Sequence, residues 1–239
     1  MVEDSVTEAI GGEAKVAVAF SGGLDSSLLA KCAGRRAKVV ACTAFSRGSG
    51  DATKAREAAK ALGVELVATE LTAKNVAEAL ASIDLPFEPT LMDRSLWCLY
   101  SLVSQSAHGS GARVMLLGQL ADELFGGYAK YSEALRLRGE DAAKSMMNAD
   151  VQEYALRGRV RDAGACGRWV EPRFPFEARE LVQFATSLPT SFKVREGVRK
   201  AVLRRATVVL GVPEELAGAA KKAAQYSSGI QRLVAGSPF

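Results

Sequence analysis

The sequence is poor in the residues on which many catalytic and metal sites depend. Its single histidine, His108, excludes a Ser/His/Asp triad and a metal site built from several histidines, and its place before Gly109 predicts a helix end. The four cysteines form no CxxC pair, so neither a zinc knuckle nor a disulfide framework is expected. We interpret Cys32, Cys42 and Cys98 as small core residues. The Gly- and Arg-rich stretch around Cys166 allows that residue more exposure.

Long apolar runs are also absent. No stretch approaches the roughly 18 uncharged apolar residues of a membrane span, and the first residues, MVED, do not begin a signal peptide. The sequence therefore predicts a cytoplasmic protein with no membrane partner. Its 239 residues, 48% of them apolar, are enough for a full hydrophobic core.

The net charge of the chain is compatible with two kinds of ligand. The net charge of +4 suits a polyphosphate substrate as readily as a nucleic acid. Basic residues concentrate in the stretch 157–179, as Arg157, Arg159, Arg161, Arg168, Arg173 and Arg179. Such a cluster is either a solvated basic face or an anion-binding surface.

Apolar runs alternate with segments of helical composition in the first half of the chain. Strands are predicted at 16–20, 39–45, 64–68 and 113–118, and helices at 24–33, 52–62, 73–83 and 93–107. This alternation predicts a doubly wound α/β fold with a mostly parallel sheet. Later helices are predicted at 132–145, 177–187, 198–209 and 213–224, with few further strands. We expect a single domain, 1–239, with an α/β nucleotide-binding core of 1–128 and a C-terminal helical layer of 129–239.

The first predicted strand ends in the heptapeptide SGGLDSS, residues 21–27. Its two glycines allow a tight turn that presents backbone N–H groups to an anion, and the positive end of the next helix points to the same place. Asp25 within a phosphate cradle favours a bridging Mg²⁺, although a glycine turn with Ser and Asp caps can also lack a ligand. The heptapeptide resembles the SGGxDS signature of the PP-loop ATP pyrophosphatases, which are HUP-like adenine nucleotide alpha hydrolases. That resemblance implies cleavage of ATP to AMP and pyrophosphate.

A second string follows the fourth predicted strand. Residues 118–128, GQLADELFGGY, resemble the DE-L-F-GGY motif of the synthetase domain of asparagine synthetases. Residues 171–206 are similar to that family's R-x-P-F, L-P and Gly-x-x-Lys-x-x-Leu-Arg stretches, so the resemblance spans nearly the whole chain. The ends of the first and fourth strands face one crevice, where Asp25 and Asp122 can hold Mg²⁺ from two sides.

The resemblance implies a set of site residues. Lys200, Asp25 and Asp122 are the catalytic residues, and the two aspartates are also the metal ligands. Lys200 would offset charge that develops at the α-phosphate. The implied ATP-binding residues are Ser21, Gly22, Gly23, Leu24, Asp25, Ser26, Ser27, Ala44, Phe45, Ser46, Gly118 and Lys200. The backbone of 44–46 would read adenine, although Phe45 is equally suited to core packing. Residues 221–229, KKAAQYSSG, resemble a segment that folds over the site.

The chain departs from the family pattern in three respects. The family usually reads Ser-Gly-Glu-Gly where this chain has LGQL, so Gln119 replaces a glutamate and cannot act as a carboxylate base. Glu177 stands where the family has an aspartate after Pro-Phe. Too few residues precede the first strand for a glutaminase domain with its N-terminal cysteine nucleophile. We therefore expect free ammonia, ammonia from a separate glutaminase subunit, or another nucleophile.

These features predict an AMP-forming ligase. A small-molecule carboxylate attacks ATP in the presence of Mg²⁺, and ammonia or an amine then displaces AMP from the acyl-adenylate. One alternative is a tRNA-modifying PP-loop enzyme that adenylates a nucleobase and holds phosphates with the arginines of 157–179. Another is a non-catalytic nucleotide-binding protein, suggested by the altered segment 117–120. The acceptor, the nitrogen source and the oligomeric state, a homodimer included, stay open.

Overall fold

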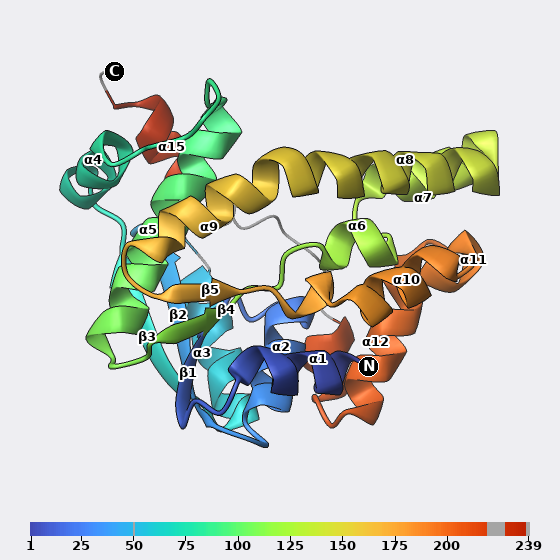
Figure 1. Cartoon of the computed structure of the whole chain (residues 1–239), viewed down its shortest axis with the longest axis horizontal. Helices are drawn as coiled ribbons and strands as arrows, with labels where there is room; N and C mark the ends of the chain where they lie inside the picture. Colours follow the sequence, from blue (N-terminus) through green and yellow to red (C-terminus); the bar gives the residue numbers. More distant parts are fainter. Residues whose placement is uncertain (50, 219–227, 238–239) are drawn as a thin grey trace.

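A five-stranded parallel sheet forms the centre of the computed structural model, which describes residues 1–49, 51–218 and 228–237. Its strand order is β3-β2-β1-β4-β5 (Figure 1). The strands are β1 (Lys15–Ala19), β2 (Lys38–Phe45), β3 (Glu65–Glu70), β4 (Val114–Leu116) and β5 (Glu171–Arg173). The doubly wound α/β fold predicted from the sequence is confirmed.

Successive side chains of β1 face opposite cores, because neighbouring residues of a strand point to opposite faces of the sheet. Val16 and Val18 pack on the face covered by helices α1 to α3, and Ala17 packs on the face covered by α4, α5 and α15. These helices are α1 (Val2–Ile10), α2 (Leu24–Ala33), α3 (Asp51–Leu62), α4 (Ala73–Ala81), α5 (Leu91–Gly109) and α15 (Ile230–Ala235). Burial on both faces explains why the strands read as nearly continuous apolar runs.

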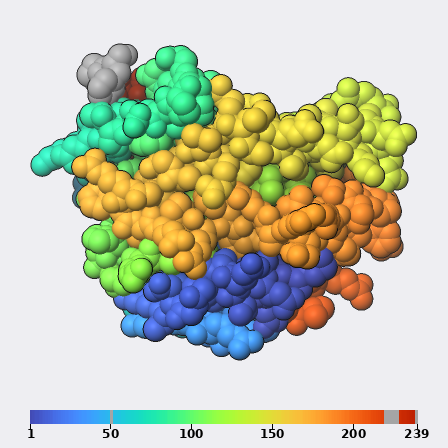
Figure 2. Space-filling model, in the orientation of Figure 1, coloured from blue at the N-terminus to red at the C-terminus, as the bar shows by residue number. Residues whose placement is uncertain are grey.

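The C-terminal part is mainly helical, as predicted. Its elements are α6 (Ala121–Phe125), α7 (Ala129–Arg138), α8 (Glu140–Glu153), the π-helical turn η1 (Tyr154–Gly158), α9 (Arg159–Gly167), the 3₁₀ turn η2 (Pro175–Glu177), α10 (Arg179–Ser187), α11 (Thr190–Lys193), the hairpin of β6 (Val194–Arg195) and β7 (Val198–Arg199), α12 (Ala201–Val209) and α13 (Glu214–Gly218). In Figure 2 the orange segments of this part lie directly beside the blue N-terminal residues, and the yellow segments lie beyond the orange ones.

Several predicted boundaries were wrong. The helix expected at 132–145 is divided between α7 and α8 by Gly139, whose φ of 84° suits glycine. The helix expected at 198–209 begins only at Ala201, because the preceding residues form the β6-β7 hairpin. Of the helix expected at 213–224, residues 219–224 lie outside the described part.

The structure also tests the predictions made for His108, for the four cysteines and for membrane-spanning segments. His108 lies in the last turn of α5, as expected. All four cysteines are buried, so the greater exposure allowed for Cys166 is not observed: α9 packs it against α5. No helix in the described ranges is both long and apolar enough to cross a membrane.

The strand order places the ligand-binding edge of the sheet. From β1 the chain proceeds through β2 to β3 at one edge, and it then returns to β4 and β5 on the other side of β1. In doubly wound sheets, ligands bind beyond the carboxyl ends of the strands where this order reverses. The segments that follow β1 and β4 therefore border the expected site.

Candidate active site

The turn between β1 and α2 is closed by its own hydrogen bonds. The Ser26 hydroxyl donates to the Gly23 carbonyl at 3.2 Å and accepts from the Ser21 backbone N–H at 3.3 Å. Gly22 has a φ of 66°, and a Cβ there would lie 3.0 Å from the backbone oxygen of Lys54. A side chain is therefore excluded at position 22, and the turn reaches the start of α2 in a fixed shape.

Three distant segments meet beside this turn. The Lys200 ammonium lies 2.7 Å from both carboxylate oxygens of Asp25 and 2.7 Å from Oδ1 of Asp122. Asp25 is in the first turn of α2, Asp122 is in α6, and Lys200 immediately precedes α12. Lys200 is also one of three described non-glycine residues with a positive φ, at 57°. This conformation costs on the order of 1 kcal/mol and is typical of functional sites.

The charge of Lys200 is kept by its two partners. The residue is 4% exposed, and burial alone would lower its pKa. The carboxylates of Asp25 and Asp122 outweigh that effect, so the pKa of Lys200 is raised above its ordinary value. The site thus holds a permanent cation between two carboxylates.

The donor set at this point fits Mg²⁺. Asp25 and Asp122 both contact the Lys200 ammonium, so their carboxylates lie close together. Mg²⁺ is commonly held by one or two protein carboxylates together with substrate phosphates. Within residues 1–49, 51–218 and 228–237, no cluster of three or more His, Cys, Asp or Glu side chains could hold a metal by itself.

Two glycines make this convergence of charges sterically possible. A Cβ at Gly118 would lie 3.2 Å from the Cβ of Asp25. At Gly127 it would lie 1.7 Å from Oδ1 of Asp122 and 2.5 Å from Cε of Lys200. The second glycine of the GGY string is therefore required by its close approach to the charged side chains.

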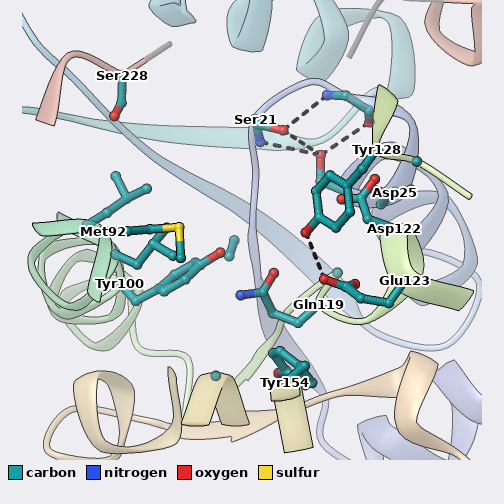
Figure 3. Close-up of a pocket in the computed structure, with 18 of the residues that line it drawn as sticks. Ser21, Asp25, Met92, Tyr100, Gln119, Asp122, Glu123, Tyr128, Tyr154 and Ser228 are labelled. Carbon is teal, nitrogen blue, oxygen red and sulfur yellow. Dashed lines mark hydrogen bonds between the residues drawn. The ribbon is translucent and has the colours of Figure 1, made fainter. Parts of the chain in front are cut away.

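A cavity of about 850 Å³ opens onto this cluster (Figure 3). Figure 3 shows Ser21 and Asp25 on one side of the cavity and Met92 and Tyr100 of α5 on the opposite side. Arg199, Arg204 and Leu96 also line it. The volume lies in the upper part of the range for small-molecule sites. The cavity therefore has one side lined by the glycine-rich turn and one side lined by apolar and aromatic residues of α5.

Most predicted ATP-binding residues lie at this cavity. The predicted site residues that line it are Ser21, Gly23, Leu24, Asp25, Ser26, Ala44, Gly118, Asp122 and Lys200. Gly22, Ser27, Phe45 and Ser46 are not among its lining residues. The Ser46 N–H donates to the Ser228 carbonyl and the Phe45 carbonyl accepts from Leu71, each at 2.8 Å, so these two backbone groups have partners within the protein. Of the predicted segment 221–229, residues 221–227 lie outside the described part, and Ser228 lines the cavity.

Sequence reasoning missed several residues that line the cavity. The Tyr128 hydroxyl donates to Glu123 Oε1 at 2.7 Å, and burial followed by the charge of Glu123 raises the pKa of Tyr128. Arg199 donates to the Gly127 carbonyl at 3.0 Å. Tyr128 and Glu123 stand in the DE-L-F-GGY string, and Arg204 stands in the Lys-x-x-Leu-Arg stretch. The sequence motifs contain these residues, but a motif does not show which of its side chains face the cavity.

The arginines of 157–179 do not form one solvated face. Arg161 is 5% exposed and contacts Asp93 at 2.9 Å and Asp162 at 2.8 Å. Arg159 pairs with Glu177 at 2.9 Å, and Arg173 pairs with Glu171 at 2.8 Å. These arginines are engaged with carboxylates of the same chain.

The fold and the site together define an α/β protein with a doubly wound sheet, a glycine-rich turn after β1 and a buried lysine shared by two aspartates beside that turn. The family model described as asparagine synthase matches residues 1–171 and 136–236. The chain belongs to the asparagine synthase family.

The relatives show how much of a longer protein the chain resembles. It is 30% identical to a putative glutamine-hydrolyzing asparagine synthetase 1 of Methanocaldococcus jannaschii, over 98% of this chain and 49% of that protein. It is 32% identical to asparagine synthetase domain-containing protein 1 of Mus musculus, over 60% of this chain and 26% of that protein. It therefore spans about half or less of the length of these relatives. Among solved structures, NMN synthetase from Francisella tularensis covers 100% of this chain and 88% of its own at 12% identity, with a TM-score of 0.49.

Proposed function

We propose that the chain is an AMP-forming ligase that adenylates a small-molecule carboxylate and transfers the acyl group to ammonia or an amine. The observation that carries the proposal is the buried Lys200 ammonium held between Asp25 and Asp122 beside the 21–27 turn. Membership of the asparagine synthase family supports the same chemistry. The nitrogen would arrive as free ammonia, from a glutaminase subunit, or as another amine.

The reaction needs two displacements. In the first, a carboxylate oxygen bonds to the α-phosphorus of ATP, the bond to the β-phosphate bridge breaks, and pyrophosphate leaves. In the second, nitrogen bonds to the acyl carbon, AMP leaves with the former carboxylate oxygen, and the nitrogen loses a proton. Carboxylates resist amines unless they are activated, so the adenylate supplies the leaving group.

Each part of the site has a role in this scheme. Backbone N–H groups of the turn and the N-terminus of α2 bind the polyphosphate. Lys200 offsets the charge that develops on phosphorus. Mg²⁺ held by Asp25 and Asp122 would neutralise phosphate charge during the displacement. Ala44, at the end of β2, would read the adenine edge with its backbone.

Pyrophosphate release tests the proposal. ATP and Mg²⁺ are supplied with aspartate, other amino acids or bulk tRNA, each with and without ammonium. We expect release that depends on a carboxylate substrate and falls at least about a hundredfold in Asp25→Asn. Asp84→Asn, at an exposed position away from the cavity, is the matched control. Dependence on tRNA would instead favour nucleobase adenylation, and ATP binding without release would favour a binding protein.

A further inference from the structure

The cavity extends well beyond the proposed nucleotide position. In Figure 3, Ser228 lies at one end of the cavity and Tyr154 at the other, and Ser21 of the phosphate turn lies between them. The Ser228 carbonyl accepts from the Ser46 N–H just after β2, so this is the end near the proposed adenine position. Tyr154 lies on the side of β5, since the charge of Glu177, shortly after β5, acts on it. The Tyr154 end therefore remains for the second substrate.

Three tyrosines from three separate segments line this end. Tyr100 belongs to α5, Tyr128 immediately precedes α7, and Tyr154 begins the π-helical turn η1. We call Tyr100, Tyr128 and Tyr154 the tyrosine end of the cavity. Met92, which is 48% exposed, lies on the same side as Tyr100 (Figure 3).

Two of these tyrosines border the cavity with their rings rather than with their hydroxyls. The Tyr128 hydroxyl is donated to Glu123, and the Tyr154 hydroxyl is buried. The ring of Tyr154 is also tightly placed: a Cβ at Gly158, the last residue of η1, would lie 2.4 Å from its Cδ2. Single π-helical turns are rare and occur frequently at functional sites. The tyrosine end therefore presents aromatic surface in a defined position.

The charged groups around the tyrosine end are paired with one another. The pairs are Arg157–Asp93, Arg161–Asp93, Arg161–Asp162 and Lys130–Asp150. The amide nitrogen of Gln119 likewise donates to Asp162. A second charge on the acceptor would have to displace a partner from one of these pairs, and a buried charge left without its partner is unfavourable. An uncharged body fits this end better.

We propose that the acceptor is an aromatic carboxylate with no second charged group, and that the tyrosine end binds its ring while its carboxylate lies toward Asp25 and Lys200. The inference rests on the proposed ligase function and names the substrate class. Contacts between aromatic rings are stronger than their buried area alone accounts for, and a methionine sulfur such as that of Met92 also packs favourably on a ring. Aspartate, by contrast, would bring both a second carboxylate and an ammonium to this end.

ATP–pyrophosphate exchange without ammonium tests the inference, because it follows adenylation alone. The acceptors are benzoate, phenylacetate and 3-phenylpropionate, their cyclohexyl counterparts, butyrate and aspartate. We expect the best aromatic acceptor to exceed butyrate and aspartate in kcat/KM by about ten- to hundredfold, as burial of a ring of this size requires. It should exceed its cyclohexyl counterpart by about two- to tenfold, which is the contribution of the aromatic contacts themselves.

Two variants locate the contact. Tyr100→Leu should bring the ratio of the aromatic acceptor to its cyclohexyl counterpart close to one, a change that a loss of stability alone would not produce. Met92→Gln, at an exposed position that tolerates substitution, should raise the KM for the aromatic acceptor but not the KM for ATP. Leu91→Gln is the matched control, because Leu91 is 43% exposed in the same turn of α5 and does not line the cavity. It should change neither constant.

The possible failures are distinguishable. Exchange that is as fast with aspartate or butyrate as with every aromatic acceptor would overturn the inference and leave the ligase function in place. An equal rise in the KM for ATP in Met92→Gln would also overturn it, because the tyrosine end would then bind the nucleotide. A wild-type protein that exchanges pyrophosphate with none of the carboxylates would remove the ligase function and the inference together.

Discussion

Replacing Lys200 by methionine isolates the charge at the centre of the site. Methionine retains much of the length and apolar volume of lysine but carries no ammonium. The carboxylates of Asp25 and Asp122, each 2.7 Å from that ammonium, would then face one another without a countercharge. Removing one partner of a buried ion pair costs about 3–5 kcal/mol. Because the two aspartate side chains are 22% and 17% exposed, we expect a loss of about 2–3 kcal/mol near neutral pH.

The pH dependence follows from the direction of the pKa shift. The folded-state pKa of Lys200 is raised, so its stabilisation is fully present below the ordinary lysine value of 10.5 and is lost as pH rises through the folded value. The variant lacks this alkaline loss. At acid pH, protonation of the aspartates removes their mutual repulsion, and the difference in stability between wild type and variant should shrink.

Urea unfolding followed by fluorescence of Trp97 and Trp169 measures this loss. The triple variant Lys200→Met/Asp25→Asn/Asp122→Asn removes all three charges and should recover most of the stability. Lys144→Met, at an exposed lysine of α8, is the matched control. A triple variant as unstable as the single variant would refute the reasoning, because the loss would then reflect packing rather than charge.

Three further predictions concern the rest of the molecule. Burial would raise the pKa of Asp93, but hydrogen bonds from Thr90 and Arg161 hold this pKa below the ordinary value of 3.8. The ionised Asp93 therefore stabilises the folded protein fully above pH 3.8, and this contribution is lost as the pH falls through the lowered folded-state pKa. Asp93→Asn should therefore cost about 3 kcal/mol at neutral pH and flatten the acid limb of a Tm-against-pH curve, and an unchanged acid limb would contradict this. Gly127→Ala should cost about 1–3 kcal/mol and abolish pyrophosphate release, because its Cβ meets Asp122. Gly167→Ala, where a Cβ meets nothing within 4 Å, should leave both Tm and release intact, and equal effects would argue against the steric explanation. Burial raises the thiol pKa of all four cysteines, so iodoacetamide should label the native protein far more slowly than the urea-unfolded protein; one rapidly labelled native thiol would contradict their buried placement.

The central strands could be predicted because their local pattern agrees with their tertiary role. β1 and β2 are buried on both faces and read as apolar runs followed by a turn or a helix. β5 could not be found this way, since its three residues, Glu-Pro-Arg, include two charged side chains and are only half-buried or exposed. It is a strand because β4 pairs with it. The start of α12 was equally hidden, because the hairpin before it continues the apolar spacing of the helix.

In the candidate site too, the motifs identified the residues but not the contacts between them. The motifs supplied Asp25, Asp122 and Lys200, but not the fact that one ammonium contacts both carboxylates, since that depends on the meeting of three separate segments. The contact between Gln119 and Asp162 was hidden for the same reason: the two residues are 43 positions apart. A cluster of arginines in sequence likewise gives no information about the carboxylates that approach it in the fold.

Transfer of oxygen from the acceptor to AMP tests the central claim most directly. The acceptor carboxylate is labelled with ¹⁸O, and the products are examined by mass spectrometry after reaction with ATP and ammonium. Attack of the carboxylate on the α-phosphorus, followed by displacement of AMP by nitrogen, predicts one labelled oxygen in each AMP and none in pyrophosphate. Unlabelled AMP, or formation of ADP in place of AMP, would contradict carboxylate adenylation at this site.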